Sequence, residues 1–215
     1  MFLAVWVSVA VGVGAASRAL AARDSTQQRR RGAVFADVQF TSHRSSIAVA
    51  CLLCAVVVAL SARQNPGVTV AFDCILAGSG TWLSFVDIDT HTVPRRSQVI
   101  VWTGAAALLS VAGLAGGSVS MTGAAGGSVA MWGVMKTFEM LSRGDMGPAD
   151  AVFAGYLGMF VGSRSVSLVP AALMTAFVLG GVAALLLAVV GGFGRRSHLP
   201  FAPFLFLGAV ISVLR

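Results

Sequence analysis

Residues Leu168 to Gly191 read LVPAALMTAFVLGGVAALLLAVVG, a run of 24 residues without a charged side chain. A helix rises 1.5 Å per residue, so about 20 apolar residues cross the roughly 30 Å hydrocarbon core of a bilayer. The stretch therefore predicts a transmembrane helix. The whole chain of 215 residues is 57% hydrophobic and 11% charged, which is typical of multi-spanning membrane proteins rather than of soluble domains.

Further apolar stretches along the chain predict the same kind of helix. With the first they are Phe2 to Leu20, Ser46 to Ala62, Val68 to Val86, Gln98 to Gly117, Met121 to Leu141, Ala149 to Gly162, Leu168 to Gly191 and Phe201 to Leu214. The sixth and eighth are short for a complete crossing. The predicted fold class is all-α: a polytopic membrane protein with seven to eight transmembrane helices.

The basic residues predict the orientation, because cytoplasmic loops carry the excess of Lys and Arg. With the N-terminus outside, only Arg63, Arg164 and Arg215 of the 15 basic residues fall on the outer side, which leaves 12 on the cytoplasmic side. The net charge of +7 is then explained by topology and by contact with anionic lipid. We therefore expect the lipid bilayer to be a partner of the chain, and we expect no binding to nucleic acid.

Three segments follow from this topology. Residues 1–20 are an N-terminal transmembrane anchor, retained because no basic region precedes the apolar stretch. Residues 21–45, ARDSTQQRRRGAVFADVQFTSHRSS, form a basic cytoplasmic loop, and residues 46–215 form the membrane-embedded domain. The cysteines of the CLLC stretch, Cys51 and Cys54, lie inside a predicted span and are expected to pack rather than to bind a metal. The glycine-rich stretches are expected to pack helices together.

The acidic residues are few, and their positions matter. Lys136 and Glu139 have the spacing of an ion pair on one helix, and Asp73 is expected near the outer interface without chemistry. Four acids remain, all at predicted cytoplasmic ends of spans: Asp87, Asp89, Asp145 and Asp150. They are either interfacial loop charges or functional groups, since an ionisable group at membrane depth is costly. Two carboxyls about 3 Å apart share one proton and can activate a water for peptide hydrolysis, without metal or cofactor.

The stretch FVDIDTHTVPRR, Phe85 to Arg96, resembles the first active-site motif of the type IV prepilin peptidases. In that family an aspartate at the end of a span is followed seven residues later by proline, in a pattern like DLRxxxIP. Asp87 and Pro94 have this spacing, and Asp89 occupies a variable position. The resemblance implies that Asp87 is catalytic.

The stretch RGDMGPADAVFAGYLGMFVG, from Arg143, is similar to the family's second motif, MGxGD, which is followed by a glycine-punctuated helix. The register with Met146, Gly147, Ala149 and Asp150 on MGxGD also places Gly158 and Gly162 on the two later glycines. It implies that Asp150 is the second catalytic residue, with Asp145 as the alternative. The chain departs from the motif at Ala149, where glycine is expected, and at Val152, where lysine is expected.

The stretch LPFAPFLFLGAVIS, Leu199 to Ser212, looks like the family's IPFGPFLALGA ending. The resemblance implies an aspartic endopeptidase of the bacterial cytoplasmic membrane that removes the leader of type IV prepilins or pseudopilins at the cytoplasmic face. The family's cysteine-containing cytoplasmic insert is missing, so methyl transfer is not expected. The alternative is a catalytically divergent membrane subunit or a small transporter.

Overall fold

The computed structural model describes residues 2–30, 44–64, 68–91, 93, 95–114, 119–142, 146–190 and 199–214. These residues form eight α-helices and no strand, which confirms the predicted all-α class. The helices are α1 (Phe2–Arg30), α2 (Arg44–Gln64), α3 (Val68–Thr90), α4 (Arg95–Leu114), α5 (Met121–Leu141), α6 (Pro148–Arg164), α7 (Leu168–Val189) and α8 (Ala202–Val213).

Helix bounds follow the predicted spans, with one large extension. Helix α5 has the predicted bounds, and α3 and α7 begin at the predicted residues. Helix α1, however, continues to Arg30, ten residues beyond the predicted end at Leu20. These residues are polar but include Ala, Arg and Gln, which favour helix. The first part of the predicted cytoplasmic loop is therefore helical. Polar residues mark the end of an apolar span, but a helix can continue through them.

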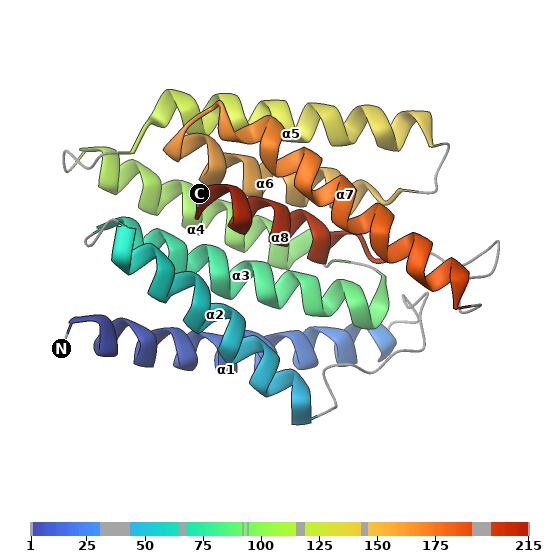
Figure 1. Cartoon of the computed structure of the whole chain (residues 1–215), viewed down its shortest axis with the longest axis horizontal. Coiled ribbons are helices and arrows are strands. Elements are labelled where there is room, and N and C mark those ends of the chain that lie inside the picture. The colour runs from blue at the N-terminus through green and yellow to red at the C-terminus, as the bar shows by residue number, and fades with distance from the viewer. Residues whose placement is uncertain are drawn as a thin grey trace. The chain divides into compact units, whose positions relative to one another are not determined.

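The chain divides into two compact units, Met1–Met121 and Thr122–Val213. In the first unit α1 contacts α2 and α3, α2 contacts α3, and α3 contacts α4. In the second unit α6, α7 and α8 contact one another. Within each unit, consecutive helices run in opposite directions (Figure 1).

Small residues bring the helices of the first unit close together. A Cβ atom on Gly14 of α1 would lie 2.6 Å from the carbonyl oxygen of Ala50 on α2. A Cβ atom on Gly78 of α3 would lie 3.3 Å from the hydroxyl of Ser17 on α1. The thiol of Cys54 lies 3.7 Å from the hydroxyl of Thr81, between α2 and α3. All three cysteines are free, and in these helices they occupy packing positions.

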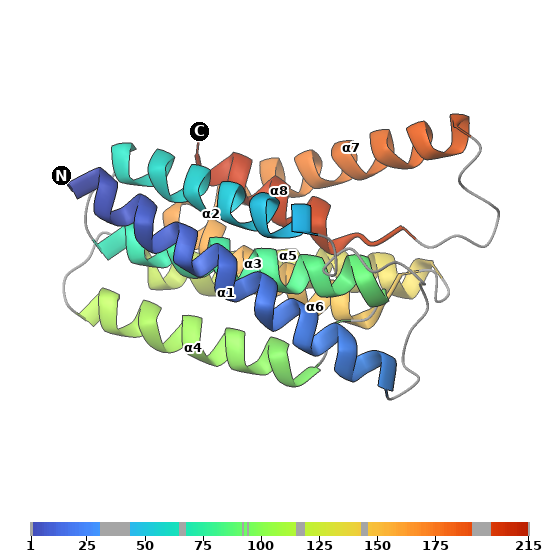
Figure 2. The ribbon, with the colours of Figure 1, turned by 90° about the horizontal axis from the view of Figure 1, so that it is seen from below.

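Aromatic rings hold the second unit together. The ring centroids of Phe138 on α5 and Phe177 on α7 are 5.0 Å apart, and those of Phe177 and Phe201 are 5.4 Å apart. Helix α8 lies along α7 (Figure 2), and a Cβ atom on Gly208 of α8 would lie 2.9 Å from the backbone nitrogen of Ala176 on α7. Helix α6 is buried from Phe153 to Ser163, so it forms the core of this unit.

Among the described residues, α7 is the single helix that meets both the length and the hydropathy expected of a membrane span. It has 22 residues and a mean hydropathy of 2.4 over its most apolar window, and 22% of that window is buried. Two shorter apolar helical stretches are Ser45–Ala59 and Ala202–Val213. A span in α7 agrees with the prediction, and the remaining spans stay predictions.

Candidate active site

The last turn of α3 carries the two aspartates of the first motif. The predicted apolar span ended at Val86, with Asp87 and Asp89 at its cytoplasmic end, and α3 continues through both residues to Thr90. The Thr90 hydroxyl donates a hydrogen bond to the Val86 carbonyl at 2.8 Å, which is the usual way for a helical threonine to satisfy its own hydroxyl. Both carboxyls are therefore held on a regular helix.

Both aspartates are buried. Asp87 is 5% exposed and Asp89 is 1% exposed. Residues two apart on a helix point about 200° from each other, so protein covers the end of α3 on nearly opposite sides. Burial of a carboxyl away from water costs free energy unless the group is hydrogen-bonded or paired. These positions are therefore unlike ordinary loop charges.

Helix α3 stops immediately after these aspartates. His91 has φ of 51°, in the left-handed region, and its amide donates to the Asp87 carbonyl at 2.8 Å. A left-handed residue just after a helix is a common terminating geometry. Val93 is buried at 8% exposure, and Pro94 lies outside the described residues.

Asp24 joins this region from α1. Its Oδ2 atom accepts a hydrogen bond from the Trp82 indole Nε1 of α3 at 3.1 Å and one from the Ser97 hydroxyl of α4 at 2.8 Å. Sequence reasoning placed Asp24 in the basic loop and missed these contacts. The signal that could have found them is the helix-forming composition of Ala21 to Arg30, which extends α1 past its apolar part.

Asp150 lies in the first turn of α6, the third residue after the N-cap Gly147. Pro148 begins the helix, a position where its missing N–H costs nothing. The Asp150 amide donates to the Gly147 carbonyl at 3.1 Å. A Cβ atom on Gly147 would lie 3.8 Å from Asp150 Oδ2, so the carboxyl turns back over the start of its own helix. Half-buried Ala149 lies beside it.

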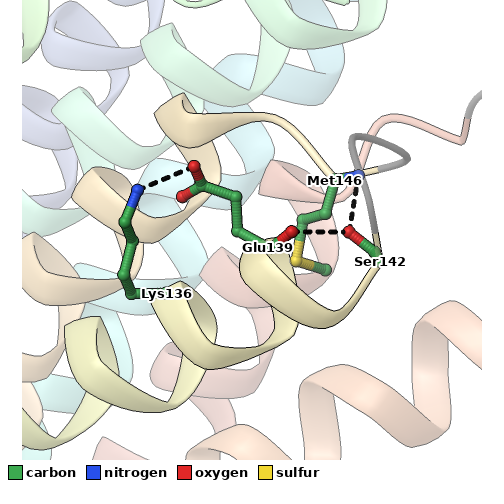
Figure 3. Close-up of polar contacts among 4 residues, drawn as sticks. All are labelled: Lys136, Glu139, Ser142 and Met146. Atoms are coloured by element: carbon green, nitrogen blue, oxygen red, sulfur yellow. Dashed lines mark hydrogen bonds and ion pairs between the residues drawn. The ribbon is translucent and has the colours of Figure 1, made fainter.

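A series of polar contacts precedes Asp150 at the end of α5 (Figure 3). The predicted ion pair is confirmed, with Lys136 Nζ 2.7 Å from Glu139 Oε1. The Ser142 hydroxyl donates to the Glu139 carbonyl at 3.0 Å and accepts from the Met146 amide at 3.3 Å. The end of α5 is thus tied to the residue before Gly147. Asp145 lies outside the described residues.

The two glycines of the predicted motif helix, Gly158 and Gly162, pack against α5. A Cβ atom on Gly162 would lie 2.9 Å from the Gly127 Cα atom. The carbonyl oxygens of Gly123 and Gly127 occupy the space beside Gly162 and Gly158, respectively. These glycines therefore set the contact between α5 and α6, which is the packing function expected for the glycine-rich stretches.

Asp87 belongs to the first compact unit and Asp150 to the second, and the pairing of their carboxyls stays a prediction. Asp73 is buried at 2% exposure near the start of α3, and its expected place at the outer interface stays a prediction. Within the described ranges, no cluster of three or more His, Cys, Asp and Glu residues could hold a metal ion.

Comparison of the chain with models of known protein families, with curated protein sequences and with solved structures finds no match.

Proposed function

We propose that the chain is a multi-spanning membrane protein with its N-terminus outside. Large apolar side chains are exposed on α1, α2, α4, α5, α7 and α8, for example Leu52, Ile100, Val129 and Leu185. None of the large apolar side chains described on α3 and α6 is exposed. In a membrane, helices of the first kind face lipid and helices of the second kind lie inside the bundle, where intramembrane acids are normally found.

We further propose that this protein is an aspartic endopeptidase of the prepilin peptidase type, with Asp87 and Asp150 as the catalytic pair. The observation that carries the proposal is the burial of Asp87 in the last turn of α3. An acid in such a place costs several kcal/mol unless it is protonated or paired, roughly the range found for buried charges. A second carboxyl that shares its proton removes this cost, and Asp150 is the partner implied by the resemblance.

The positions of Asp87 and Asp150 at opposite kinds of helix end suggest which of the two carboxyls carries the shared proton. Asp87 lies at the C-terminal end of α3 and Asp150 at the N-terminal end of α6. The helix dipole disfavours a negative charge at the first position and favours it at the second. We therefore infer that Asp87 holds the proton and polarises the scissile carbonyl, while ionised Asp150 takes a proton from the attacking water.

The proposed substrates are type IV prepilins or pseudopilins, in which a short basic leader ending in glycine precedes an apolar helix. The leader remains in the cytoplasm and the helix lies in the bilayer, so the scissile bond sits at the inner face. The proposed topology places the C-terminal end of α3 and the N-terminal end of α6 at that face. The proposed localisation is accordingly the bacterial cytoplasmic membrane, and the reaction requires no cofactor.

The test is leader removal from a prepilin by the purified protein in detergent. Asp87→Asn should lower the rate by about 100-fold or more, as expected for loss of a catalytic acid. Asp89→Asn is the matched control, because Asp89 is equally buried and two residues away, and it should retain cleavage. Equal rates for wild type and Asp87→Asn would refute the catalytic assignment.

A second candidate function is a transporter or assembly subunit without protease activity. The observation that favours it is Asp73, an acid buried within α3 at 2% exposure, since buried intramembrane acids also mark ion and proton pathways. Val152, which stands where the prepilin peptidases have a lysine, also favours a protein without protease activity. Absence of leader removal by the wild-type protein, together with proton-dependent uptake that Asp73→Asn abolishes, would support this function instead.

A further inference from the structure

One carboxylate oxygen connects three helices of the first compact unit. Asp24 Oδ2 on α1 accepts from the Trp82 indole of α3 at 3.1 Å and from the Ser97 hydroxyl of α4 at 2.8 Å. Hydrogen bonds to an ionised acceptor are stronger than those between neutral groups. Ser97 is buried and Asp24 is half-buried, so both bonds are partly shielded from competing water.

The two donors, Trp82 and Ser97, lie on either side of Asp87 in the sequence. Trp82 precedes Asp87 by five residues, and Ser97 follows it by ten. The end of α3, His91 and the connection to α4 all lie between the donors along the chain. Asp24 therefore holds both sides of the segment that carries Asp87.

Apolar packing supports the same region. Ala21 of α1, three residues before Asp24, belongs to one buried cluster with Phe85 and Val86 of α3, and Trp82 packs against that cluster. The part of α1 beyond the predicted span thus lies along the last two turns of α3. Packing sets how closely the helices approach, whereas directional hydrogen bonds to Asp24 also fix their rotation and register.

We propose that Asp24 is a positioning residue for Asp87: it holds the α3–α4 connection in place through Trp82 and Ser97. This inference rests on the proposed peptidase function and adds to it a residue outside the motifs. Asp24 does not act on the substrate in this scheme. Its removal lets the end of α3 shift, and small displacements of a reacting group lower the rate of the chemical step more than they weaken substrate binding.

The first test compares cleavage kinetics of Asp24 variants. Asp24→Ala should lower kcat by about 10-fold to 100-fold and leave KM within about twofold. Asp24→Asn should recover most of kcat, because its amide oxygen can accept both hydrogen bonds. Trp82→Phe and Ser97→Ala, which each remove one donor, should give intermediate losses.

The control is Thr26→Ala, two residues away on α1, which removes an exposed hydroxyl that donates to the Ala22 carbonyl at 2.8 Å. It should leave kcat unchanged. The proposal is overturned if Asp24→Ala behaves like Thr26→Ala, or if Asp24→Asn is as impaired as Asp24→Ala.

The second test does not depend on activity. Hydrogen exchange of the peptide spanning 88–98 should become about tenfold faster in Asp24→Ala, the change expected for loss of a hydrogen bond to a charged group, and remain near the wild-type rate in Asp24→Asn. Unchanged exchange in Asp24→Ala overturns the positioning role. If the wild-type protein cleaves no prepilin, the proposed function fails while exchange still decides whether Asp24 holds this connection.

Discussion

Gly127 of α5 and Gly158 of α6 meet backbone to backbone: a Cβ atom on either glycine would overlap the carbonyl oxygen of the other. Each glycine has a second glycine four residues away, Gly123 on α5 and Gly162 on α6, and these also face the opposite helix. Such spacing places the small residues on one helix face and lets two membrane helices approach closely. The contact fixes the position of α6 along α5, and hence the position of the first turn of α6, which carries Asp150.

Alanine at position 127 should destabilise the protein, whereas alanine at position 126 should not. Nothing lies within 4 Å of a Cβ atom on Gly126, so Gly126→Ala should gain up to about 1 kcal/mol from better helix propensity. Gly127→Ala forces α5 and α6 apart and should lose about 1–3 kcal/mol, the range for overpacked cores. Denaturant unfolding in detergent measures both variants, and equal stability would contradict the close contact.

The sequence predicted the helices well because each apolar span is also a helix, and the change from apolar to polar residues marks both. The predicted end was wrong where a helix continues beyond its apolar span. Helix α1 continues through polar residues to Arg30, ten residues beyond its apolar span. The contacts of Asp24 with Trp82 and Ser97 join residues 58 and 73 positions apart. No periodicity within one helix encodes such pairs, because they depend on how three helices pack.

The proposed topology places residues 143 and 164 on opposite sides of the membrane, since α6 lies between them. With the three native cysteines replaced by alanine, Arg164→Cys should react with a membrane-impermeant maleimide added to intact cells. Arg143→Cys should react only after the membrane is made permeable, because it lies on the cytoplasmic side. Labelling of both positions from outside would show that α6 does not cross the bilayer.

The choice between Asp150 and Asp145 is open to direct test. Asp150 is held at the start of α6, with its carboxyl over the N-cap Gly147, where the helix dipole favours the ionised form that a general base needs. Asp150→Asn should therefore lower leader cleavage by about 100-fold or more, and Asp145→Asn should leave it within about twofold. The opposite result would assign the second catalytic position to Asp145.

The Ser142 hydroxyl should slow hydrogen exchange of the Met146 amide, which lies just before α6. It accepts from the Met146 amide at 3.3 Å and donates to the Glu139 carbonyl at 3.0 Å (Figure 3). Ser142→Ala removes both contacts and should cost about 0.5–1.5 kcal/mol of stability, with faster hydrogen exchange at Met146. Thr137→Ala is the control, because its exposed hydroxyl only donates back to the Gly133 carbonyl at 2.8 Å, and it should leave that exchange unchanged. If Met146 exchanges equally slowly in both variants, the connection before Asp150 is held by other contacts.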